Sequence, residues 1–96
     1  MKYFHRTSAS PASVISLANG YLGKVLTPTE ESPRRRAFGG VLGVLTVTVM
    51  AEGGHYTLVT VETNQPGESE IDRLAKRFLG EVHSLADPVH VLRGAY

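Results

Sequence analysis

The chain has 96 residues, a formal net charge of +1 and 42% hydrophobic residues, which is the composition of a single globular domain covering residues 1–96. This net charge gives no field strong enough to indicate binding to nucleic acid or to acidic lipid. The absence of cysteine excludes disulfides, a thiol nucleophile and thiolate metal sites. We expect no membrane span and no signal peptide, so the predicted location is cytoplasmic. A chain of this length is near the lower limit for a self-sufficient core, and we expect a homodimer.

The first predicted element is a short strand from Lys2 to Ser8. In a strand, Tyr3, His5 and Thr7 would lie on one face. Phe4, Arg6 and Ser8 would lie on the other. Both faces are mixed in polarity. The sequence therefore leaves open which face is buried.

A helix is predicted to follow at Ser10-Pro11. Serine caps free amides, and proline loses nothing at the first helical position because its missing N–H would be unpaired there. The helix should end by Gly23, and Asn19-Gly20 offers an earlier end. One helical face is apolar and is expected to pack on a sheet, through Val14, Ile15, Ala18, Tyr21 and Leu22.

The middle of the chain has the weakest pattern. We predict a strand fragment at Lys24 to Leu26 and a loop over Thr27 to Pro33, because TPTEESP is rich in turn-forming residues. Arg34 to Phe38 is expected to be extended. The glycines that follow it, Gly39-Gly40, permit a bend or bulge before the next strand.

The hairpin from Val41 to Thr63 is the segment around which the chain is organised. Its two arms alternate, and one face collects Leu45, Val47, Val49, Val59 and Val61. A two-residue Gly53-Gly54 loop would mix the faces, so a three-residue loop of Glu52, Gly53 and Gly54 is preferred, with Gly54 left-handed. This loop pairs Val49 with Thr57, Val47 with Val59 and Leu45 with Val61.

A second, longer helix is predicted to begin at Ser69, with Asp72 in the position of a capping-box acid. Its apolar residues recur at helical spacing: Ile71, Leu74, Ala75, Phe78, Leu79, Val82, Leu85 and Ala86. Asp72 and Lys76 are expected to form an ion pair on the exposed side. Gly80 is expected to be a close-packing point or the floor of a pocket. Asp87-Pro88 should end the helix, and the tail from Val89 to Tyr96 is predicted to add an edge strand, fold over the sheet or cross to a partner.

These elements predict an α+β fold, an antiparallel sheet covered on one face by two helices in the order β-α-β-β-β-α. From FGGVLG (38–43) through the hairpin to SEIDRLAKRFLGEVH (69–83), the chain resembles the C-terminal half of the START-like helix-grip superfamily, the polyketide cyclase and lipid-transfer group. HRTSASPASVISLANGY (5–21) is similar to that group's first strand and helix start. The resemblance implies a curved sheet that grips the C-terminal helix, with an apolar ligand between them. The middle, Lys24 to Gly40, is too short for all the family's strands, so we expect a reduced version whose cavity is small, absent or completed by a second subunit.

Several side chains are candidates for ligand binding in such a fold: His5, Tyr21, Phe38, Tyr56, Phe78 and His83. The aromatic ones are equally typical of an ordinary core, and a histidine on a helix flank is typical of a packed or solvated side chain. Arg34, Arg35 and Arg36 form a candidate anion site. Their structural interpretation is a solvated edge, neutralised by Glu30-Glu31.

Three functions remain after these observations. The first is the binding of an apolar small molecule between the sheet and the C-terminal helix. The alternative is a non-catalytic homodimeric interaction module without a ligand cavity. An enzyme of the cyclase or hydrolase kind, using His5 or His83, comes last because the sequence shows no acid–base pair. We expect no cofactor, no metal site, and no nucleic-acid or membrane partner.

Overall fold

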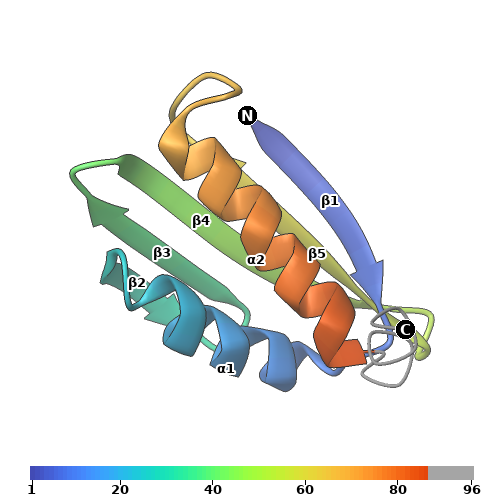
Figure 1. The fold of residues 1–96 in the computed structure, drawn as a ribbon. Helices are drawn as coiled ribbons and strands as arrows, with labels where there is room; N and C mark the ends of the chain where they lie inside the picture. The colour runs from blue at the N-terminus through green and yellow to red at the C-terminus, as the bar shows by residue number, and fades with distance from the viewer. Residues whose placement is uncertain (87–96) are drawn as a thin grey trace.

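The computed structural model describes residues 1–86 and confirms the predicted α+β class (Figure 1). Two helices lie across one face of a five-stranded antiparallel sheet whose strand order is β1-β5-β4-β3-β2. No helix in this described part is long and apolar enough to cross a bilayer. The elements in chain order are β1 (Lys2–Thr7), α1 (Pro11–Leu22), β2 (Thr27–Ser32), β3 (Arg35–Gly40), β4 (Gly43–Glu52), β5 (Tyr56–Thr63) and α2 (Glu70–Ala86).

The strand β2 corrects the prediction of a loop over Thr27 to Pro33. It pairs antiparallel with β3, with a register shift between Pro28 and Glu30. Every residue of β2 is exposed, so backbone pairing and ion pairs to β3 hold it in place rather than burial. The predicted strand fragment at Lys24 to Leu26 is also wrong, because these residues form the turn after α1.

The hairpin has the predicted apolar face but a different register. Val49 lies opposite Val59 and Val47 opposite Val61, and the loop between Glu52 and Tyr56 is Gly53–His55. The predicted pairs are therefore wrong by two residues, a shift that preserves which side chains share a face. Gly54 is left-handed as predicted, with φ +73°, and Gly53 is left-handed too, with φ +58°. Two consecutive left-handed glycines leave Glu52 in the strand and move the turn one residue along.

The core lies between the sheet and the two helices. β1 turns Tyr3, His5 and Thr7 toward this side, which answers the question that its sequence left open. Ser10 caps α1 by accepting a 3.2 Å hydrogen bond from the Ser13 amide. The fully buried side chains of this layer include Val14, Leu22, Phe38, Leu45, Val47, Val59, Val61, Ile71, Phe78 and Val82.

The helix α2 begins as predicted, because the Ser69 hydroxyl accepts a 3.2 Å hydrogen bond from the Asp72 amide. Gly80 corrects a prediction, since it is exposed and a methyl group added there would meet no other part of the described chain within 4 Å. It is neither a close-packing point nor a pocket floor, because it lies on the side of α2 that faces away from the sheet. The predictions for Asp87 to Tyr96 lie outside the described residues.

Candidate functional site

One face of the sheet lies opposite the helices and is uncovered among residues 1–86. We call it the open face. It consists of the outward-facing residues of four strands: Phe4, Ala37, Val44, Thr46, Thr48, Met50, Leu58 and Thr60. Phe4 is 61% exposed and Met50 is 57% exposed. Phe4 lies opposite Thr60, and Met50 opposite Leu58, so the apolar side chains of the middle strands adjoin one another.

Charged side chains surround the open face in pairs of opposite sign. Arg6 Nε lies 2.7 Å from Glu52 Oε1, and Arg35 Nε lies 2.6 Å from Glu30 Oε2. Lys2 lies opposite Glu62 in the β1–β5 register. The centre of the face is therefore apolar or hydroxyl-bearing, and its rim is charged but balanced.

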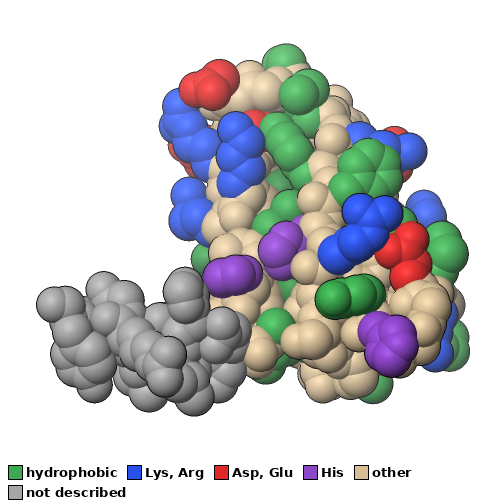
Figure 2. Space-filling view, turned by 90° about the vertical axis from the view of Figure 1, so that its right-hand side faces the viewer, with side chains coloured by type: hydrophobic (Ala, Val, Ile, Leu, Met, Phe, Trp, Pro, Cys, Tyr) green, Lys and Arg blue, Asp and Glu red, His purple; other side chains and the backbone are tan. Residues whose placement is uncertain are grey.

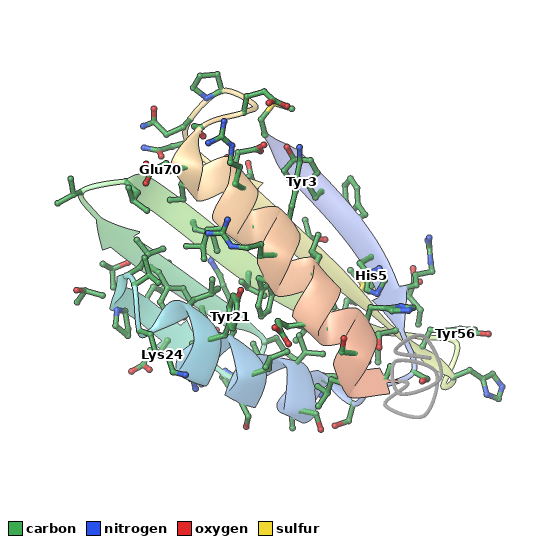
Figure 3. The ribbon with its side chains drawn as sticks, viewed as in Figure 1. Tyr3, His5, Tyr21, Lys24, Tyr56 and Glu70 are labelled. Atoms are coloured by element: carbon green, nitrogen blue, oxygen red, sulfur yellow. The ribbon has the colours of Figure 1, made fainter. Side chains whose placement is uncertain are left out.

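Three of the predicted ligand residues belong to the packed interior. Phe38 and Phe78 are fully buried. Tyr21, between α1 and α2 in Figure 3, is half-buried with its ring centroid 6.3 Å from that of Phe78. Their packing is that of a core, in agreement with the structural interpretation of these aromatics.

The other three predicted ligand residues meet at the far end of β1. The His5 and His83 ring centroids are 6.0 Å apart, in an edge-to-face arrangement. Burial, and secondarily the charge of His83, lowers the pKa of His5 below its usual value. Figure 3 shows His5 between β1 and α2. These residues border an open hollow of about 280 Å³, lined by His5, Arg6, Thr7, Ser8, Tyr56, His83 and Ala86.

A second hollow of about 280 Å³ opens beside the first half of α2. Apolar side chains reach it from the turn after α1, from the β3–β4 turn and from α2, and two arginines flank it. Its lining is Val25, Leu42, Glu70, Arg73, Leu74 and Arg77. None of these residues was among the predicted ligand residues, because the hollow depends on where two turns meet a helix.

The polar pair of Tyr3 and Asp72 was missed by the sequence analysis. The Tyr3 hydroxyl donates a hydrogen bond to Asp72 Oδ1 across the β1–α2 contact. Asp72 Oδ2 accepts from the Glu68 amide at 3.1 Å and lies 3.4 Å from Lys76 Nζ. The predicted ion pair with Lys76 is confirmed, but Asp72 is fully buried rather than exposed, because the start of α2 packs against β1.

This pair has perturbed acid–base properties. The Tyr3 hydrogen bond, helped by the Glu68 amide and Lys76, holds the pKa of Asp72 below its usual range despite burial. The same hydrogen bond raises the pKa of Tyr3 to about 12. The pair therefore stays in one protonation state, a neutral phenol and a carboxylate, through the physiological range, and we assign it a structural role.

The arginine run does not converge on one site. Arg35 turns to the open face and Arg36 to the helices, as neighbours on a strand must. Arg36 Nε donates to Asn19 Oδ1 at 3.1 Å and lies 3.8 Å from Glu31 Oε1. Arg35 is already paired with Glu30. Two of the three guanidinium groups thus bind side chains of this chain.

The described residues contain no group of three or more histidine and carboxylate side chains that could hold a metal ion. The chain matches no protein-family model, no curated protein and no solved structure. Its function is therefore inferred from the geometry of the open face and the hollows.

Proposed function

We propose that this chain is a non-catalytic interaction module that forms a homodimer through the open face of its sheet. The observation that carries the proposal is the exposure of Phe4 and Met50 on a face that α1 and α2 leave uncovered. Antiparallel sheets often leave one face in water, but that face is then predominantly polar. Here the face carries phenylalanine, methionine, valine and leucine side chains beside its threonines.

The size of the open face fits a small dimer interface. Five strands at about 4.8 Å spacing and about 20 Å of common length give roughly 500 Å² per copy, or about 1,000 Å² in total. Specific interfaces begin at about this area. The layout also fits, because specific interfaces have an apolar centre and a polar rim.

The balanced rim favours a second copy as the partner. A face with charges of one sign would repel itself in a two-fold contact and would select a partner of opposite charge. The Arg6–Glu52 and Arg35–Glu30 pairs instead bring both signs to the contact. A two-fold axis through the β4–β5 region places the apolar centres against each other.

Sedimentation equilibrium of the full chain tests this proposal. We expect a dimer for the wild type and a monomer for Met50→Glu, because the substitution places a carboxylate among the apolar side chains of the contact. Val41→Glu is the matched control, since Val41 is fully exposed in the β3–β4 turn and away from the open face. A wild type that stays monomeric at about 100 μM, or a Met50→Glu variant that remains dimeric, would contradict the proposal.

A second candidate function is the binding of a small apolar molecule at the sheet–α2 boundary, as the START-like resemblance implies. The hollow beside Leu42 and Leu74 favours it, because its lining combines apolar side chains with two arginines and one carboxylate, Glu70. Such a lining suits a ligand with an apolar body and an anionic group. The fully buried Phe38 and Phe78 fill the middle of the layer, so the ligand would occupy this end only.

An anionic apolar dye, anilinonaphthalene sulfonate, serves as the probe for this candidate. We expect dye fluorescence to rise with the wild type and to fall in Leu42→Glu, with Val41→Glu as the neighbouring control. Met50→Glu distinguishes the two surfaces, because dye bound beside Leu42 is unaffected by it. A dye signal that disappears in Met50→Glu but not in Leu42→Glu would place the dye on the open face and contradict this candidate.

A further inference from the structure

Within residues 1–86, no strand pairs with the outer edge of β1. Met1 and Thr63 exchange both backbone hydrogen bonds, at 3.0 and 2.8 Å. In an antiparallel ladder such doubly bonded pairs alternate with non-bonded ones. The β1–β5 register has no shift, so Tyr3, His5 and Thr7 bond to β5. The N–H and C=O groups of Lys2, Phe4 and Arg6 therefore point away from the sheet.

The side chains of the same three residues give this edge a distinct pattern. Lys2, Phe4 and Arg6 lie on the open face in the order basic, apolar, basic. Figure 2 faces the side of the molecule where β1 lies and shows Lys and Arg side chains beside hydrophobic ones. Arg6 pairs with Glu52 and Lys2 lies opposite Glu62, but both carboxylates are on the inner strands, so the outermost charges on the open face of β1 are both positive.

An added strand places a side chain directly opposite each of these residues. Cross-strand neighbours have Cβ atoms about 4.5–5.5 Å apart, where opposite charges attract and like charges repel. The pairing therefore favours acidic residues at positions i and i+4 of the added strand, with an apolar residue at i+2. Because this pattern is symmetric about its apolar residue, it fits both a parallel and an antiparallel added strand.

We propose that the β1 edge binds an extended acidic segment of another protein by strand addition, with the pattern acidic-x-apolar-x-acidic. Main-chain hydrogen bonds to Lys2, Phe4 and Arg6 hold the segment, and the charge pattern selects it. This surface overlaps the proposed dimer contact at Phe4, but its main-chain hydrogen bonds use the strand edge, and Met50 on β4 takes no part in it.

The two edge strands of a second copy, β1 and β2, are poorer partners for the β1 edge than an acidic segment. If two β1 strands paired antiparallel around Phe4, Lys2 of each copy would face Arg6 of the other, and like charges would be opposed. The acidic strand β2 carries Pro28, which lacks an N–H, and its register shifts beside that residue. An acidic segment of a different protein is therefore the best match.

Fluorescence anisotropy with two labelled peptides tests the proposal on the full chain. Both contain the same strand-forming centre, flanked as Glu-Thr-Val-Thr-Glu in one and as Lys-Thr-Val-Thr-Lys in the other. We expect the acidic peptide to bind about tenfold more tightly or better. In Lys2→Gln/Arg6→Gln the preference should disappear. Equal affinity of the two peptides for the wild type, or no binding of either, would overturn the proposal.

Amide hydrogen exchange locates the bound peptide. With the acidic peptide, the Lys2, Phe4 and Arg6 amides should gain protection, whereas those of Tyr3 and His5 already bond to β5. Arg6→Pro removes one outward N–H, and Arg6→Ala removes the same charge but keeps that N–H, so Arg6→Pro should bind more weakly than Arg6→Ala. Protection confined to β2 would overturn the proposal.

The outcome is independent of the dimer. Met50→Glu should retain the preference for the acidic peptide, because Met50 lies on the face and not at the edge. Peptide preference in a monomeric protein would leave the edge proposal intact and remove only the dimer. A dimer that shows no preference for the acidic peptide would leave the dimer proposal intact and overturn the edge proposal.

Discussion

The two faces of the sheet are built from the same strands but have different physical roles. The face toward α1 and α2 carries most of the fully buried aliphatic and aromatic side chains of the sheet, among them Val47, Val61 and Phe38, and Phe78 of α2 packs against them. The open face alternates apolar residues with threonines and ends in paired charges. The first face contributes the buried core on which stability depends, and the second is exposed and is the face through which we propose association. Substitutions on the covered face should therefore change stability and not association. Substitutions on the open face should change association and leave stability nearly unchanged.

The largest expected effect is on the covered face. Phe78→Ala should lower the free energy of unfolding by about 3–5 kcal/mol, because it leaves a cavity in the core. Phe4→Ala on the open face should cost less than about 1 kcal/mol in urea unfolding of dilute protein, where the proposed dimer would be dissociated. If Phe78→Ala does not fold, Phe78→Leu provides a smaller loss to compare. Equal losses in the free energy of unfolding for the Phe4 and Phe78 variants would contradict the separate roles of the two faces.

The next effect concerns a buried carboxylate on the covered side and an exposed one on the open side. Asp72→Asn should lower the melting temperature clearly, because the Tyr3 hydroxyl, the Glu68 amide and Lys76 all lose a charged acceptor. Glu52→Gln removes only the exposed ion pair with Arg6 and should change stability by less than about 1 kcal/mol. Tyr3→Phe and Asp72→Asn should be non-additive. Additive losses would show that Tyr3 and Asp72 act independently.

The same pair predicts a pH dependence. Asp72 has a lowered pKa when folded, so its contribution is present above the ordinary carboxyl pKa and is lost as pH falls through the folded pKa. Tyr3 has its pKa raised to about 12, so its contribution is present below the ordinary phenol pKa and is lost as pH rises toward that value. The stability difference between wild type and Asp72→Asn should be flat near neutral pH and shrink at both extremes. A difference that grows in acid would contradict this linkage.

The smallest predicted effect is a gain in stability. Gly80→Ala should stabilise the chain by about 0.5–1 kcal/mol, because alanine loses less backbone entropy in a helix and space is open there. Gly23→Ala is the contrasting control. Its added methyl group would lie 2.3 Å from the Asn19 carbonyl oxygen, so this change should destabilise. Thermal melts of both variants check the sign of each effect.

The sequence predicted the elements whose pattern is local. The α2 periodicity, the Ser10 and Ser69 caps and the apolar face of the hairpin depend on residues close together in the chain, and the structure confirms them. The strand β2 was missed because its residues are exposed and polar, and only pairing with β3 makes it a strand. The predicted hairpin register was wrong because the loop residues allow the same three-residue turn at two neighbouring positions.

The candidate sites were harder to predict than the fold. The contact of His5 with His83 and the bond of Tyr3 to Asp72 join residues more than sixty positions apart, as the separation of 69 between Tyr3 and Asp72 shows. Neither contact leaves a local signal in the sequence. The open face was not predicted, because only the placement of both helices on the opposite side shows that it is uncovered.

The pairing of β1 with β5 has a consequence for how the chain folds. β1 is made early, yet its partner strand comes much later, and the Met1–Thr63 hydrogen bond spans 62 positions. At about 5–20 residues per second, ribosomal synthesis leaves β1 without its neighbour for several seconds. The β4–β5 hairpin closes locally and is the natural nucleus, whereas β1 must be added across a long loop. During that interval Phe4 and Tyr3 are exposed on an unpaired segment of the nascent chain.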